Sequence, residues 1–203
     1  MYNFTIPMAL MDFLPVAFFG VTTVLLLKNF HQKMSASLYA LLAAGSINVF
    51  LAGFCKATWK LLYAGGICDF AALEEMFLPV NSIGLLFVGV SMIGLLCCKK
   101  KTVVLSTAPV VFSGSLVFIM MMVIGLGGLC AGLSVIAAKM KKKASILLFV
   151  LSFLFAMAMG YMSGQDSTLA WVNWAEQSIN TVSQLCLMLG TISLHRANLK
   201  DWI

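Results

Sequence analysis

The sequence predicts an all-α integral membrane protein with seven transmembrane helices, and three observations support this class. Of the 203 residues, 62% are hydrophobic and only 10% are charged, whereas soluble domains carry about 25% charged residues. Apolar runs of roughly 20 residues, the length that crosses a hydrocarbon core, recur along the chain. Short basic clusters separate these runs. We therefore expect a single polytopic membrane domain over residues 1–203.

Four basic clusters set the predicted topology. They lie at residues 28–33, 99–101, 139–143 and 196–200. The positive-inside rule places all four in the cytoplasm, so each interval between them crosses the membrane an even number of times. This gives seven spans with the N-terminus outside and the C-terminus cytoplasmic, and we expect the plasma membrane. Because the clusters are short and lie between apolar spans, the net charge of +6 does not predict nucleic-acid binding.

The predicted spans follow from the apolar runs. They cover residues 7–27, 35–63, 77–98, 103–123, 129–138, 144–161 and 171–194. Outer loops are expected at residues 64–75, which contain Asp69, Glu74 and Glu75, and at residues 163–167. No basic region precedes the first apolar run and no small-residue cleavage site follows it, so we expect no removable signal peptide.

The interval from residue 102 to 138 is too long for one span and leaves little room for a turn between two. The basic clusters at both of its ends favour two crossings, with a tight outer turn at Gly125-Leu126-Gly127-Gly128. The alternative is a re-entrant hairpin, which would give five full crossings without changing the side of either terminus. Glycines elsewhere in the spans, such as Gly84, Gly89 and Gly132, predict close helix packing.

Residues 171–184 are too polar to face lipid. At about 100° per residue, four carboxamides fall within an arc of roughly 60° on one helix; they belong to Asn173, Gln177, Asn180 and Gln184. Glu176 lies at the edge of this amide stripe. Because burying so many polar groups in hydrocarbon costs free energy, we expect the stripe to face other helices or a wet cavity.

Polar residues of other spans are expected at a similar depth near the outer boundary, counting about 1.5 Å per residue along each helix. The predicted site is an outward-opening cavity between the first, second, third and seventh spans, with Trp171 and Trp174 as an aromatic collar. Its candidate binding residues are Asp12, Asn48, Lys56, Trp59, Lys60, Asn81, Trp171, Asn173, Trp174, Glu176, Gln177, Asn180 and Gln184. Of these, Asn48, Asn180 and Gln184 lie deepest.

Structural explanations compete with this site. Lys56 and Lys60 could snorkel to the surface or pair as solvated charges with the acids of the 64–75 loop. The amides could join helices through hydrogen bonds worth about 1 kcal/mol each. The run of amides along one face favours a hydrated path or a polar-ligand site as strongly as it favours such links.

The sequence carries no catalytic or metal-binding signature. His31 and His195 lie at the cytoplasmic ends of their spans, far from the outer carboxylates, and the six cysteines have no CxxC spacing. We expect no metal and no cofactor, and the sequence favours a non-enzymatic role. The expected partners are the lipid bilayer, a small polar solute or ion, and a second copy or another membrane subunit.

Three functional hypotheses remain. The first is binding or transport of a small polar solute or ion through the outward-opening cavity. The second is a receptor-like or accessory membrane protein, which senses a ligand or docks a partner without transport. The third is a lipid-acting intramembrane enzyme that uses Asp12 and Glu176 as paired acids.

Two resemblances concern transporters. Residues 81–83 and 177–179 are Asn-Ser-Ile and Gln-Ser-Ile, at corresponding places in spans three and seven, and they would mark a three-one-three internal duplication. Seven spans in that arrangement resemble the SWEET, PQ-loop and nicotinamide-riboside-transporter group, although no PQ dipeptide is present. Residues 19–26 are similar to the first span of acetate/succinate permeases, whose Asn-Pro-Ala-Pro-Leu-Gly motif is missing here. Neither resemblance covers enough of the chain to assign a family.

Overall fold

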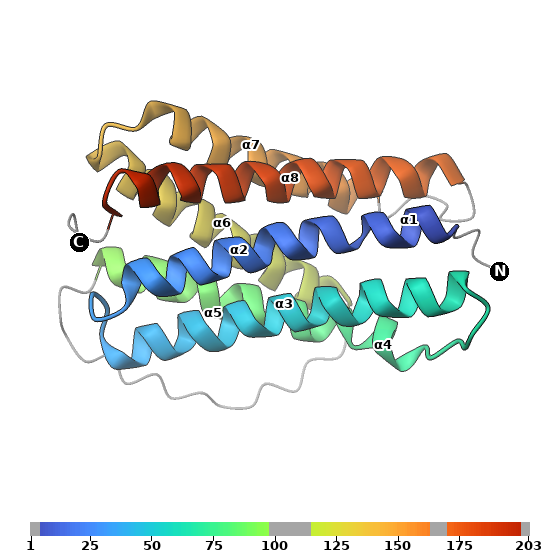
Figure 1. Ribbon diagram of the computed structural model, residues 1–203. Helices are drawn as coiled ribbons and strands as arrows, with labels where there is room; N and C mark the ends of the chain where they lie inside the picture. Colours follow the sequence, from blue (N-terminus) through green and yellow to red (C-terminus); the bar gives the residue numbers. More distant parts are fainter. Residues whose placement is uncertain (1–4, 98–114, 163–169, 200–203) are drawn as a thin grey trace.

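The computed structural model describes residues 5–97, 115–162 and 170–199, and this part of the chain is helical without strands (Figure 1). The helices are α1 (Ile6–Met11), α2 (Phe13–Phe30), α3 (Ala36–Ala64), α4 (Ala72–Glu75), α5 (Phe77–Cys97), α6 (Ser115–Lys139), α7 (Lys143–Met162) and α8 (Ala170–Arg196). Within these ranges, five stretches are long and apolar enough to cross a membrane: α1 with α2, α3, α4 with α5, α6, and α7. The predicted class, an all-helical multi-pass membrane protein, is confirmed. The number of seven spans and their orientation stay predictions.

The helices connect two ends of the bundle that differ in charge. The basic end carries Lys28, Lys33, Lys142 and Arg196 at the ends of α2, α7 and α8. The acidic end carries Asp12, Asp69, Glu74, Glu75 and Glu176. Helices α2, α5, α6 and α8 run from the acidic to the basic end, whereas α3 and α7 run in the opposite direction (Figure 1).

The long helices form a ring in chain order. Helix α2 packs on α3, α3 on α5, α5 on α6, α6 on α7 and α7 on α8, and α8 packs back on α2. Inside the ring, apolar side chains fill the middle and the half nearer the basic end, where the core consists of residues such as Phe19, Leu26, Leu42, Met92, Leu133, Phe149 and Leu187. The buried charges lie in the other half, near the acidic end.

The outer surface of the ring is apolar. Large hydrophobic side chains are exposed on every long helix, for example Val24, Leu51, Ile93, Ile119 and Leu154. So much exposed apolar surface is typical of a protein that acyl chains cover.

The turn predicted at Gly125–Gly128 is wrong, and so is a hairpin that reverses there. Helix α6 runs without interruption from Ser115 to Lys139. A Cβ atom on Gly125 would meet the backbone of Leu85, and one on Gly128 would lie 3.0 Å from the Cα of Gly89. The glycines therefore allow two helix backbones to touch, which is a common role of glycine in membrane helices. The first part of the predicted fourth span, residues 103–114, lies outside the described residues.

Helices α5 and α6 are parallel. Gly125 lies against Leu85 and Gly89, whereas Gly132 lies against Met92, so the contacts advance in the same direction along both helices. Cys97 at the end of α5 and Ser115 at the start of α6 therefore lie at opposite ends of the bundle. This arrangement returns the end of α6 to the basic end, where α5 also ends.

The first span is interrupted at Asp12. Pro15 has no backbone N–H, and its ring clashes with the carbonyl of the residue four positions earlier, which is Met11. The helix accordingly ends at Met11 and restarts at Phe13, with Asp12 between them. Proline thus places a carboxylate at a helix break inside the bundle.

The predicted outer loop contains one short helix, α4, which is followed directly by α5. The loop acids Glu74 and Glu75 belong to α4, and Asp69 precedes it. The loop therefore adds acidic side chains to the end of the bundle at which Asp12 lies.

Candidate functional site

A buried ion pair joins the first span to α3. Lys60 Nζ lies 2.7 Å from Asp12 Oδ2, and the two side chains are 7% and 9% exposed. Taking two charges out of water costs several kcal/mol per ion, and only good geometry with further polar neighbours offsets that cost. The polar side chains around Asp12 and Lys60 therefore decide whether the cost of burying the pair is offset.

Lys56 and Glu176 complete a charge cluster, which we define as Asp12, Lys56, Lys60 and Glu176. Lys56 lies one turn before Lys60 on α3, and its ammonium is 4.3 Å from the centroid of the Phe77 ring at the start of α5. Glu176 on α8 is close enough to act electrostatically on both Asp12 and Lys56. With two carboxylates and two ammoniums, the cluster is neutral overall, and its members come from the break between α1 and α2, from α3 and from α8.

Three buried amides lie at the same end of the bundle. Asn81 comes from α5, one turn after Phe77, and Asn173 and Gln177 come from α8 on either side of Glu176. Amides both donate and accept hydrogen bonds, so they complement a neutral set of charges. From the predicted set, the structure thus places at one end of the bundle Asp12, Lys56, Lys60, Asn81, Asn173, Glu176 and Gln177.

The amide stripe of α8 faces protein, as predicted. Asn173, Gln177 and Thr191 are buried, and Asn180 and Gln184 are half-buried. Its direction follows from helix geometry: five turns are 18 residues, so Gln177 and His195 point the same way. His195 Nδ1 lies 2.7 Å from Asn29 Oδ1 of α2, so this side of α8 faces α2.

The deeper part of the stripe is less fully paired. Gln184 Oε1 is buried and has no hydrogen-bond partner among the described residues. The hydroxyl oxygens of Thr23 on α2 and Ser46 on α3 are likewise buried without a hydrogen-bond partner among the described residues. Buried polar atoms without partners cost free energy, so their occurrence near the middle of the bundle needs an explanation.

Other predicted site residues lie apart from the charge cluster. Trp171 and Trp174 are exposed, at 63% and 38%, because they occupy the outward side of α8. They therefore do not form a collar around the buried polar residues. Asn48 is half-buried on α3, and eight residues of helix place it about 12 Å deeper than Lys56. Asn180 and Gln184 lie deeper than Glu176 in the same way.

The sequence leaves open an alternative in which Lys56 and Lys60 are both solvated and pair with acids of the loop. That alternative is wrong for Lys60, because its partner is the buried Asp12. Asp69 of the loop instead accepts a hydrogen bond from Trp59 Nε1 at 3.0 Å. The indole of Trp59 is buried and links the loop to α3.

The polar contacts nearer the basic end were not predicted from the sequence. These are the Asn29–His195 contact between α2 and α8, and two serine pairs between α7 and α8. The 18-residue spacing from Gln177 to His195 was the available signal, since it places His195 on the polar side of α8. The partner on α2 could not be found from that spacing.

Fold and site together define the class: an all-helical multi-pass membrane protein with a buried ion pair between its helices. Comparisons with protein-family models, with curated proteins and with solved structures found no match to this chain.

Proposed function

We propose that this protein binds a small polar solute or ion at the charge cluster and transports it across the membrane. The observation that carries the proposal is the buried Asp12–Lys60 ion pair, with Lys56 and Glu176 beside it. Ionisable residues inside membrane spans are expensive and commonly belong to substrate or ion pathways. Apolar side chains of similar volume would join the same helices at lower cost.

The cluster offers both signs of charge to a ligand. A cation can take the place of a lysine ammonium beside Asp12 or Glu176, and an anionic group can take the place of a carboxylate beside Lys56 or Lys60. The amides of Asn81, Asn173 and Gln177 supply donors and acceptors for the rest of a polar solute.

The apolar core supports access from the acidic end. It fills the middle of the ring and the half nearer the basic end, so a solute at the charge cluster reaches water by the shorter route past α4 and the start of α8. Passage to the basic end requires that the helices around the core move apart.

Transport is tested with purified protein in proteoliposomes. The probes are labelled glycine, rubidium, acetate and glycerol, which represent a zwitterion, a cation, an anion and a neutral polar solute. We expect flux of at least one probe, and we expect Glu176→Gln and Gln177→Leu to abolish it while expression persists. Ser178→Ala is the matched control, because Ser178 is the next residue on α8 and is exposed.

Each outcome decides between the hypotheses. Equal flux in the wild type and in both variants would reject this site. Stabilisation by a probe that is not transported would favour a receptor-like or accessory protein, since the site would then bind without passage. Release of products from a labelled lipid, lost in Asp12→Asn, would favour the intramembrane enzyme.

A further inference from the structure

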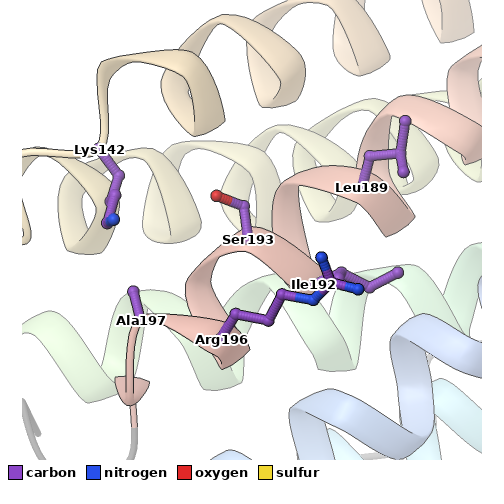
Figure 2. A pocket seen from close by; sticks show the side chains of 6 residues that line it. All are labelled: Lys142, Leu189, Ile192, Ser193, Arg196 and Ala197. Atoms are coloured by element: carbon purple, nitrogen blue, oxygen red, sulfur yellow. The ribbon is translucent and has the colours of Figure 1, made fainter.

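A second polar site lies at the opposite end of the molecule. A pocket of about 330 Å³ opens between the start of α7 and the last two turns of α8. Figure 2 shows the side chains that line it: Lys142, Leu189, Ile192, Ser193, Arg196 and Ala197. None of these residues belongs to the charge cluster, and their distance from Asp12 is most of the length of the bundle.

Two cations and a hydroxyl are among the groups that line this pocket. Lys142 precedes α7 and Arg196 ends α8, and they lie on either side of Ser193 (Figure 2). Ser193 Oγ accepts a hydrogen bond from Ser145 Oγ at 2.9 Å, so the Ser193 hydroxyl keeps its own proton to donate. Helix α7 begins at Lys143, and the unpaired N–H groups of its first turn add positive potential.

The positive charge at this end is not neutralised by the described residues. All the acidic side chains of the described ranges lie at the acidic end. The basic residues of those ranges at the basic end are Lys28, Lys33, Lys139, Lys141, Lys142, Lys143 and Arg196. A concave site with a single sign of charge concentrates counter-ions of the opposite sign.

The remaining lining is apolar and partly exposed. Leu189 lies two turns before Arg196, about 10 Å deeper along α8, and it is 43% exposed. Ile192 lies between them. A ligand that places an anionic group between Lys142 and Arg196 could therefore lay an apolar portion along α8 toward the centre of the membrane.

We propose that this pocket binds a phosphate group. Arg196 offers a planar fork of donors suited to phosphate oxygens, Lys142 a second positive charge, and Ser193 a hydroxyl donor. A phosphate group at this depth can belong to the headgroup of an anionic phospholipid or to a soluble phosphate. The apolar continuation past Ile192 and Leu189 favours the phospholipid, because basic pockets between membrane helices bind such headgroups.

The test compares two double variants that remove the same charge from the same end. Lys142→Gln with Arg196→Gln removes both cations of the pocket, whereas Lys28→Gln with Lys33→Gln removes two exposed cations outside it. Full-length protein in detergent is titrated with phosphatidylglycerol, with phosphatidylcholine or with inorganic phosphate, and the thermal unfolding temperature is measured. Native mass spectrometry of the same samples counts bound lipids.

We expect phosphatidylglycerol to raise the unfolding temperature of the wild type and of the Lys28/Lys33 variant. In the Lys142/Arg196 variant, the shift in unfolding temperature and the number of bound lipids should each fall by at least half. Ser193→Ala should give values between those of the wild type and those of the Lys142/Arg196 variant. A pocket-dependent shift with inorganic phosphate alone would support the phosphate site and assign it to a soluble ligand. Equal losses in the two double variants, or equal effects of phosphatidylglycerol and phosphatidylcholine, would overturn the proposal.

Discussion

At the scale of single residues, the Asp12–Lys60 pair makes a sharp prediction. Asp12→Leu leaves the Lys60 ammonium buried without its closest counter-charge, and Lys60→Met leaves the Asp12 carboxylate buried without its own. Breaking a buried pair from one side costs about 3–5 kcal/mol, whereas replacing both partners by apolar groups is nearly neutral. We expect each single variant to unfold at a lower temperature than the double variant Asp12→Leu with Lys60→Met.

Thermal unfolding in detergent measures this effect, with each variant at matched protein concentration. Lys33→Met is the control, because Lys33 is an exposed lysine outside the charge cluster. If the losses of the two single variants simply add in the double variant, the pair does not act as a unit.

The sequence predicted the depth of these residues but not their partners. Counting along each helix placed Asp12, Lys60 and Glu176 near one boundary of the membrane, and the structure places them at one end of the bundle. Whether Lys60 turns inward or outward depends on which helix lies beside α3, and one sequence does not contain that neighbour. In the sequence alone, the acids of the 64–75 loop are equally suitable partners for Lys60.

At the scale of helices, glycine explains both a successful and a failed prediction. Glycines in the spans were expected to allow close packing, and Gly45 and Gly84 confirm it: a Cβ on Gly84 would lie 2.8 Å from the backbone oxygen of Gly45. The sequence predicts a turn at Gly125–Gly128, because the basic clusters at both ends of the interval favour two crossings and glycine permits a tight turn. Within a membrane, the backbone has no water to bond with, so the same residues stay helical and pack.

Close packing of α5 on α6 leaves no room for a larger side chain at Gly89. Gly89→Leu inserts a side chain where even a Cβ would meet the backbone of Gly125. The two helices must separate, and we expect a loss of at least about 2 kcal/mol of stability, within the range typical of overpacking. The unfolding temperature in detergent and the yield of monodisperse protein report the loss.

Gly160 provides the matched control for that prediction. A Cβ on Gly160 would have no atom within 4 Å, although the residue is also inside a long helix. Gly160→Leu should be neutral or slightly stabilising, because leucine favours the helix over glycine. Equal behaviour of Gly89→Leu and Gly160→Leu would show that the backbones of α5 and α6 are not in contact.

At the scale of the whole molecule, the helix order repeats. In α2, α3 and α5, and again in α6, α7 and α8, the first and third helices run toward the basic end and the second runs away from it. Within each group, consecutive helices pack on each other. The two groups are in contact where α5 packs on α6 and where α8 packs on α2. An internal duplication would produce this order, and it stays a prediction.

The two contacts between the groups differ in chemistry. At α5 and α6, glycines bring backbones together, and little relative motion is available there. At α2 and α8, polar side chains meet: the charge cluster lies near the acidic end and the Asn29–His195 contact near the basic end. Polar side-chain contacts can exchange with water, so we expect the α2–α8 contact to open during transport.

Cross-linking tests that expectation and depends on the proposed transport function. With the six native cysteines replaced by alanine, Asn29→Cys with His195→Cys places a thiol pair across α2 and α8 at the basic end. A short bifunctional thiol reagent should then stop proteoliposome flux, and a reducible version should restore it after reduction. If the solute passes between α2 and α8, this contact must separate, so a link across it should block passage. Ser152→Cys with Ser183→Cys joins α7 to α8 inside one group, where the hydroxyls are 3.5 Å apart. Cross-linking that pair should leave flux unchanged; flux through protein joined at residues 29 and 195 would show that the solute does not pass between α2 and α8.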